Sequence, residues 1–385
     1  MESFVFYNPT EVLFGQQQIA RLAERIPADA RILITYGGGS VIRFGTLDEV
    51  RQALHKHTFF EFGGIEPNPS YETLMQAVAA VKEHQIDYLL AVGGGSVVDG
   101  TKFIAAAACF TGDDPWDILS KQAPVERALP LSCILTLPAT GSETNSFAVI
   151  SRKSDHSKLA FASPRVYPQH AVLDPTKTYT LPERQISNGV VDAFIHILEQ
   201  YLTYPVNAKV QDRFAEGLLL TLLEEGPRAL ATPTDYDIRA NIMWSATMAL
   251  NGLIGVGVPQ DWSTHAIGHE LTAAYGLDHA QTLAIVLPVL LDVQREQKKQ
   301  KLLQYAERIW GLRDGKDEHR INKAIEKTRE FFEMMRVKTH LADYGINAKD
   351  AAEKVVASLK RHHMTALGEH KDITPEVVAR ILLMA

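Results

Sequence analysis

Cysteine is scarce in this sequence, because Cys109 and Cys133 are the only two in 385 residues. Two cysteines are too few for a disulfide framework or for a zinc site built from thiolates. Long apolar runs are also missing: TLAIVLPVLL is too short and too interrupted by proline to span a bilayer. The start, MESFVFYNPT, lacks the basic-then-apolar order of a signal peptide. We therefore expect a cytoplasmic protein without a membrane partner.

An excess of positive charge is missing as well. The formal net charge of −7 argues against nucleic acid or an anionic membrane as the main partner, since both require a basic surface. The run REQKKQK at 295–301 is the local exception. Such a run favours a solvated helix face over a phosphate-binding patch.

The length and the pattern along the chain predict two domains, given roughly 100 to 200 residues per domain. From residue 31 to about 175, short apolar runs alternate with amphipathic stretches, which is typical of a parallel sheet covered by helices. After the proline-flanked turn near residue 180, the apolar residues follow a helical period and no strand is evident. We predict an α/β nucleotide-binding domain over 1–180 and an all-α domain over 181–385.

A glycine-rich turn follows one of the predicted strands, in YLLAVGGGSVVDGTK. Gly94, Gly95 and Ser96 lead into a helix that carries Asp99 and Lys102. Glycines let the backbone approach a phosphate closely, and the free N–H groups at the helix start can bind it. The turn is neither G-x-G-x-x-G nor G-x-x-x-x-G-K-[ST], so alone it does not distinguish a phosphate cradle from a tight turn.

An earlier turn, ITYGGGSVIRFG, is informative because it lacks an acidic residue. Domains that bind NAD usually place a carboxylate near the adenosine ribose, whereas Gly37, Gly38, Gly39 and Ser40 stand here. Without that carboxylate, a 2′-phosphate can bind the Ser40 hydroxyl and backbone N–H groups, with Arg43 nearby. The pattern favours NADP(H) over NAD(H), with a plain surface turn as the alternative.

A third polar segment, LTLPATGSETN, follows another apolar strand. Its small hydroxyl residues suit hydrogen bonds to phosphate, ribose or carboxamide groups of a cofactor. The residues concerned are Thr136, Thr140 and Ser142.

Acidic and imidazole side chains recur at helical spacing in the second half. Asp192 and His196 are four residues apart, so they lie on one helix face, about 40° apart. A carboxylate buried beside an imidazole requires compensation, which a divalent cation provides. WSTHAIGHELTAAYGLDHA adds His265 and, after a break, His279. One carboxylate and three imidazoles suit Zn²⁺ or Fe²⁺, so we predict a metal site at these four residues.

His269 stands one helical turn after His265, and we place it outside the predicted ligand set. It is positioned either to reach the substrate or relay a proton, or to hydrogen-bond a ligand. His269 and Asp99 are the candidates for a catalytic role.

Four motifs in this order, GGGSVVDGTK, LPATGSE, NGVVDAFIH and HAIGHELTAAYGLDHAQTLAIVLP, resemble the iron-containing (group III) alcohol dehydrogenase family. LITYGGGSV, FGGIEPNP and GVPQDW resemble its NADPH-dependent aldehyde reductase branch, which is related to butanol dehydrogenases. The resemblance implies a Rossmann-like domain, a helical domain and a catalytic metal at the four positions above. It also implies a homodimer, with an early strand such as EVLFG at the interface. Gly37 stands where NAD-using branches carry an acid, which supports NADP(H).

The resemblance further implies a set of cofactor contacts spread over the first domain. They are Gly37, Gly38, Ser40, Asn68, Gly94, Gly95, Ser96, Asp99, Thr136, Thr140, Ser142 and Lys158.

Together, the motifs and the family resemblance predict a metal-dependent oxidoreductase that reduces aldehydes to primary alcohols, reversibly, with NADPH. In this scheme the metal polarises the carbonyl and NADPH donates the hydride. Alternatives within the same fold are a glycerol or polyol dehydrogenase and a lyase of the dehydroquinate synthase kind. From another class, a metal-dependent hydrolase would use the cation to activate water. The residues alone leave these alternatives open.

Overall fold

Strands and helices alternate in the first half of the chain and form one parallel sheet. The computed structural model describes all residues from 1 to 385. Six strands pair in the order β1-β8-β5-β4-β2-β3, every pair parallel. Their bounds are β1 Glu11–Phe14, β2 Arg31–Tyr36, β3 Thr58–Phe62, β4 Tyr88–Gly94, β5 Leu131–Leu137 and β8 His170–Leu173. This confirms the predicted α/β class.

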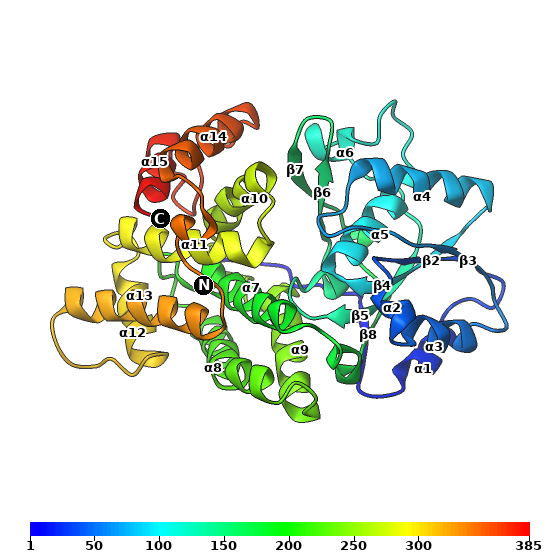
Figure 1. Ribbon diagram of the computed structural model, residues 1–385, viewed down its shortest axis with the longest axis horizontal. Coiled ribbons are helices and arrows are strands. Elements are labelled where there is room, and N and C mark those ends of the chain that lie inside the picture. Colours follow the sequence, from blue (N-terminus) through cyan, green and yellow to red (C-terminus); the bar gives the residue numbers. More distant parts are fainter. The chain divides into compact units, whose positions relative to one another are not determined.

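Helices cover both faces of this sheet, because successive strand residues point to opposite sides. Ile32 and Ile34 of β2 pack in one apolar core with α1 and α3, whereas Leu33 packs in another with α4 and α5. Figure 1 shows the two helix layers on either side of the strands. The helices are α1 Gln18–Ala23, α3 Thr46–Ala53, α4 Tyr71–Glu83 and α5 Gly95–Ala108.

An antiparallel hairpin follows β5 and the polar segment LTLPATGSETN. It consists of β6 (Phe147–Arg152) and β7 (Ser157–Ala162). Lys153 forms an ion pair with Glu66 at 2.9 Å, which ties the turn of the hairpin to the segment before α4. Two one-turn helices complete this part, α2 Ser40–Arg43 and α6 Asp117–Ser120.

The second half of the chain contains no strand, which confirms the predicted helical domain. The helices are α7 Glu183–Tyr201, α8 Lys209–Ala231, α9 Tyr236–Leu250, α10 Ser263–Tyr275, α11 His279–Val293, α12 Lys299–Arg308, α13 Asp317–Met334, α14 Ala348–Arg361 and α15 Pro375–Met384. Residues 282–291 of α11 are all buried, as expected for a helix that is apolar around its whole circumference. It shares one apolar core with α10, α14 and α15 (Figure 1). No helix combines the length and apolar character needed to cross a membrane.

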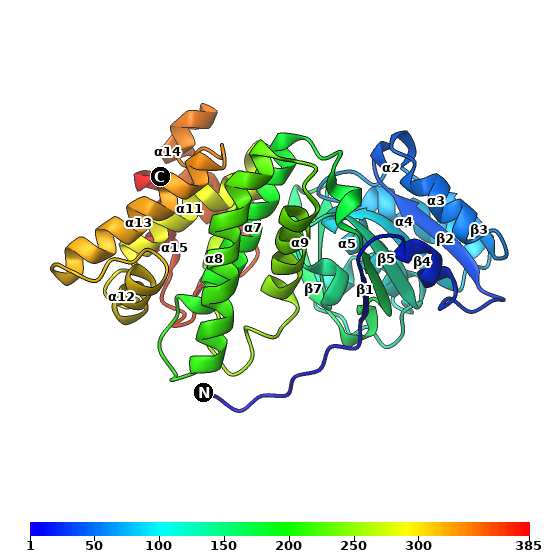
Figure 2. The same ribbon diagram turned by 90° about the horizontal axis from the view of Figure 1, so that it is seen from below.

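The chain divides into two compact units that do not follow chain order throughout. One contains Tyr7–Leu181 and Thr234–Thr247, and the other contains Met1–Phe6, Pro182–Pro233 and Met248–Ala385. Most of α9, labelled in Figure 2, therefore belongs with the sheet, where Met243 packs in the same core as Leu135 and Leu173. The predicted limits 1–180 and 181–385 rest on chain order alone and stay a prediction.

The basic run at 295–301 is not a uniformly solvated helix face, so that prediction is wrong for two of its lysines. Lys298 is buried and contacts Asp261 at 2.8 Å and Glu369 at 2.6 Å. Lys301 is buried and contacts Asp212 at 2.7 Å. Lys298 is the residue before α12 and Lys301 lies in its first turn, and carboxylates neutralise both.

Candidate metal centre and cofactor loops

Helix α7 presents a row of acidic and imidazole side chains on one face. Asp192, His196 and Glu199 follow one another at spacings of four and three residues, which places them one above the other. The helix is apolar on its other sides, and every residue from 189 to 201 is buried. The row is therefore held in the protein interior, where charged groups require partners.

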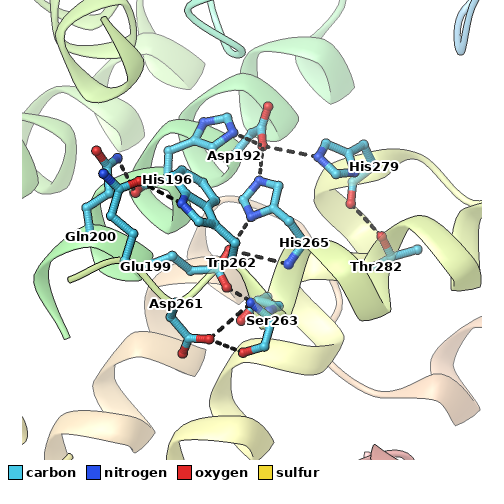
Figure 3. Close-up of polar contacts among 12 residues, drawn as sticks. Asp192, His196, Glu199, Gln200, Asp261, Trp262, Ser263, His265, His279 and Thr282 are labelled. Carbon is cyan, nitrogen blue, oxygen red and sulfur yellow. Dashed lines mark hydrogen bonds and ion pairs between the residues drawn. The ribbon is translucent and has the colours of Figure 1, made fainter. Parts of the chain in front are cut away.

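Three imidazoles converge on the carboxylate of Asp192, as Figure 3 shows. Asp192 Oδ1 lies 3.6 Å from His196 Nε2, 3.8 Å from His265 Nε2 and 3.7 Å from His279 Nε2. The ligand atoms of Asp192, His265 and His279 all lie within 4.8 Å of one another. The ring of His196 stacks on that of His265 with centroids 4.6 Å apart. The structure thus brings the four predicted ligands together from α7, α10 and α11.

This arrangement fits a divalent cation. Tetrahedral zinc has ligands at about 2.0–2.1 Å, so two ligand atoms on one ion lie roughly 3.4 Å apart. The observed separations from Asp192 exceed this by a few tenths of an ångström. The buried Nε2 of His265 makes no hydrogen bond in the protein. Three imidazoles with one carboxylate and no thiolate suit Zn²⁺ or Fe²⁺.

Glu199 is a component of the centre that the sequence interpretation missed. Its Oε2 accepts a hydrogen bond from Nδ1 of His265, and its Oε1 accepts one from the backbone N–H of Thr264 at 2.6 Å. Burial lowers the pKa of His265, but Glu199 and Asp192 outweigh it and raise that pKa to about 9. The signal was available in the sequence, because Glu199 continues the Asp192–His196 face at the next turn.

The position of His279 is fixed by the start of α11. His279 is the first residue of this helix, and Asp278 before it forms a capping box with Gln281. Asp278 also accepts a hydrogen bond from Asn188 of α7 at 2.8 Å. Helix α7 therefore carries two predicted ligands and anchors the helix that bears another, through residues that the sequence interpretation did not single out.

His269 lies beside the four converging residues. It follows His265 by one turn of α10, with ring centroids 6.2 Å apart, and its ring lies 5.0 Å from that of His279. Its side chain is half-buried, unlike the buried ring of His265. This position agrees with a place outside the ligand set, and its catalytic role stays a prediction.

In the sheet unit, the predicted cofactor loops occupy one edge. They follow β2, β4 and β5, which are neighbours and parallel, so their carboxyl ends meet there. A Cβ on Gly95 would stand 2.4 Å from Thr140 Oγ1, and one on Gly93 would stand 2.6 Å from Val97. Both distances are too short for a Cβ, so these two positions require glycine. No side chain caps the start of α5 at Gly94. The first N–H groups of this helix are therefore available to a phosphate, and the residues fit a dinucleotide.

Asp99 stabilises one of these loops. Its Oδ1 accepts a hydrogen bond from Ser142 Oγ at 2.5 Å, and its Oδ2 accepts one from the Val149 N–H at 2.9 Å. Lys102, to which the sequence interpretation gave no role, donates to Ser142 at 2.8 Å and to Asn145 at 2.9 Å. Burial lowers the pKa of Lys102 to about 8. Because both oxygens of Asp99 bind protein donors, the geometry favours a positioning role over proton transfer.

Two more residues that were predicted to contact the cofactor, Asn68 and Lys158, are far apart in the sequence but contact each other. Lys158 Nζ, on β7, donates to Asn68 Oδ1 at 2.9 Å. Asn68 has a φ of 55°, in the left-handed region that asparagine tolerates better than most residues. Their assignment to cofactor binding stays a prediction.

Family models cover nearly the whole chain. Residues 9–175 match the model "Iron-containing alcohol dehydrogenase", and residues 186–385 match "Fe-containing alcohol dehydrogenase family, C-terminal". The chain therefore belongs to the iron-containing alcohol dehydrogenase family and is an oxidoreductase. This confirms the predicted family.

Individual relatives agree with this assignment. The chain is 60% identical to the NADPH-dependent aldehyde reductase YqhD of Escherichia coli (strain K12), over 99% of each chain. It is similar to the crystal structure of E. coli K-12 YqhD with a TM-score of 0.98 and 59% identity, covering 99% of this chain and 98% of that one. It is also similar to the NADH-dependent butanol dehydrogenase A of Thermotoga maritima, with a TM-score of 0.95, 34% identity and coverage of 100% and 99%.

Proposed function

We propose that this protein is an NADPH-dependent aldehyde reductase that interconverts aldehydes and primary alcohols at a divalent metal. The observation that carries the proposal is the convergence of His196, His265 and His279 on the carboxylate of Asp192. The glycine loops after β2 and β4 supply the second requirement, a dinucleotide site. The high identity to the E. coli NADPH-dependent aldehyde reductase supports the same reaction.

The preference for NADPH over NADH rests on the loop after β2. No acidic side chain follows that strand, where Gly37, Gly38, Gly39 and Ser40 stand. A 2′-phosphate is dianionic, so the absence of a carboxylate removes the main obstacle to its binding. The more distant T. maritima relative is named for NADH, so the family alone does not decide the cofactor.

Each group of residues would have a separate role in hydride transfer. When bound, the cation supplies Lewis-acid polarisation of the carbonyl, and NADPH supplies the hydride. Asp192, His196, His265 and His279 would hold the cation, and the loops at Gly37–Ser40 and Gly94–Ser96 would hold the phosphates. The half-buried imidazole of His269 would donate a proton to the product oxygen.

We also propose that the protein acts as a homodimer in the cytoplasm. Strand β1 lies at the edge of the sheet, so one side of its backbone is available to a second copy. Phe14 on this strand and Trp244 are in edge-to-face contact and remain 38% and 42% exposed. Both cysteines are free thiols, as expected in a reducing compartment. Sedimentation of the purified protein distinguishes a dimer from a monomer of 42.7 kDa.

The proposed function is tested by following oxidation of NADPH and of NADH by freshly purified protein across short and long aldehydes. We expect rapid NADPH oxidation with aldehydes and much slower oxidation of NADH. A preference for NADH would contradict the cofactor assignment. Failure to oxidise either cofactor with any aldehyde, combined with oxidation of glycerol, would reject aldehyde reduction in favour of a polyol dehydrogenase.

A further inference from the structure

We propose that Glu199 is a positioning residue that fixes the tautomer of His265 and thereby sets the metal affinity of the centre. The inference rests on the proposed function, since it concerns the cation that His265 would bind. The sequence interpretation gave Glu199 no role, and its side chain is only 1% exposed.

The contacts of Glu199 determine which nitrogen of His265 carries hydrogen. Oε2 of Glu199 contacts Nδ1 of His265, and a carboxylate only accepts hydrogen bonds. Nδ1 must therefore be the N–H nitrogen. Only Nε2, the atom that faces Asp192 at 3.8 Å, is then left to lose its hydrogen and offer a lone pair to a cation. A cation binds a lone pair, so this tautomer is the one that the metal requires.

Glu199 also fixes the direction of the ring. Asp192 and Glu199 stand on the same face of α7, seven residues apart, and they contact opposite nitrogens of His265 (Figure 3). An α-helix of this length is rigid over two turns, so the ring is held between two fixed carboxylates. Hydrogen bonds of this kind to the far nitrogen of a metal-binding histidine are a common feature of metal sites.

A second, purely structural role of Glu199 is visible and must be separated from the first. Glu199 accepts hydrogen bonds from the backbone N–H groups of Thr264 at 2.6 Å and His265 at 3.3 Å, at the start of α10. These are N–H groups that a helix cannot satisfy internally. Loss of Glu199 would thus destabilise the protein even if the tautomer of His265 were irrelevant.

The substitution Glu199→Gln separates the two roles. The amide oxygen of glutamine can still accept the hydrogen bond from Thr264, whereas its NH₂ group would face Nδ1 of His265. That NH₂ group favours the opposite tautomer, with hydrogen on Nε2, which cannot bind a cation. Glu216→Gln is a matched control, because Glu216 of α8 is another buried carboxylate, which accepts hydrogen bonds from Tyr201 of α7 and Arg308 of α12.

The experiment measures transfer of Zn²⁺ from the zinc-loaded full-length protein to a competing chelator, with thermal unfolding recorded in parallel. We expect Glu199→Gln to weaken Zn²⁺ affinity about 10- to 100-fold. Glu216→Gln should lower the unfolding temperature and leave Zn²⁺ affinity unchanged. Glu199→Asp, which retains an acceptor-only group, should bind Zn²⁺ more tightly than Glu199→Gln.

If Glu199→Gln binds Zn²⁺ with wild-type affinity, the inference is overturned and Glu199 is only a helix cap. An equal loss of Zn²⁺ affinity in Glu216→Gln would overturn the inference as well. If Glu199→Gln does not fold, the ¹⁵N-histidine NMR spectrum of the zinc-loaded wild type decides. A hydrogen on Nδ1 of His265 is expected there, and a bare Nδ1 contradicts the inference. Absence of Zn²⁺ binding by the wild type would instead reject the proposed function.

Discussion

Gly38 has open space where a side chain would stand. A Cβ built at this position meets no atom within 4 Å, and its φ lies outside the left-handed region. The substitution Gly38→Asp should therefore fold normally and place a negative charge near the proposed 2′-phosphate. We expect the KM for NADPH to rise about tenfold or more, equivalent to ~1.4 kcal/mol, because like charges repel. Initial rates of NADPH and NADH oxidation with one aldehyde provide the measurement.

The matched control for this substitution is Gly38→Asn, which has nearly the same shape and no charge. It should change the KM for NADPH much less than Gly38→Asp. An equal rise in both variants would show that the effect is steric, and the argument from the missing acid would then fail.

His265 and His269 are one turn apart on α10, yet we expect different roles for them. His265→Ala removes an imidazole that contacts Asp192, so the purified variant should lose both metal and turnover. His269→Ala should retain metal and lose turnover, since its ring lies beside the centre at 5.0 Å from His279. Metal analysis of both variants checks this. Full metal content in His265→Ala would show that the ligand set is wrong.

Among side chains, the sequence revealed those that share a helix face or gather in a histidine-rich stretch, and it gave less indication of those whose partners are distant in the sequence. Asp192 and His196 are visible together because a four-residue spacing places both on one face. Lys102 gave no such signal, since its acceptors Ser142 and Asn145 are about 40 residues further along the chain. The contact of Glu199 with His265 likewise depends on the packing of α7 against α10.

Among the elements, the turn between α11 and α12 is held by a buried ion cluster. Lys298 donates to Leu202 O at 2.8 Å, after α7, and pairs with Asp261, before α10, and with Glu369, before α15. Lys298→Met would leave two buried carboxylates without a cation. We expect it to reduce the free energy of unfolding by about 3–5 kcal/mol, measured by denaturant unfolding.

The exposed pair Lys354–Asp350 on α14 is the control for Lys298→Met, since both side chains are about half exposed. Lys354→Met should change the free energy of unfolding by roughly 0–1 kcal/mol, because solvent screens such pairs. Equal effects of the two substitutions would show that the buried cluster contributes little.

Most elements of the first half were predictable because their apolar patterns are unambiguous. RILITY and YLLAV are buried strands, whereas the intervening stretches have a helical period. The basic run at 295–301 shows the limit of such reasoning. Its composition indicates a solvated face, but Lys298 and Lys301 turn inward because carboxylates distant in sequence face them. Pairing between distant charges does not appear in a local pattern.

For the whole molecule, the order of strands and helices predicted the α/β class and the helical second half. The grouping of α9 with the sheet unit was not predictable in this way. Its periodicity matches that of its helical neighbours, and only tertiary contacts, such as the hydrogen bond from Thr247 to Glu143 at 2.6 Å, reveal its partner. Met1–Phe6 likewise groups with helices of the second half of the chain, in the unit of Pro182–Pro233 and Met248–Ala385.

The proposed function requires that Asp192, His196, His265 and His279 hold one divalent cation on which aldehyde reduction depends. The most direct test measures metal content per chain and NADPH oxidation before chelation, after chelation and after readdition of Fe²⁺ or Zn²⁺. We expect about one ion per chain, loss of turnover on chelation with NADPH binding retained, and recovery on readdition. Undiminished turnover in protein shown to be free of metal would contradict the account.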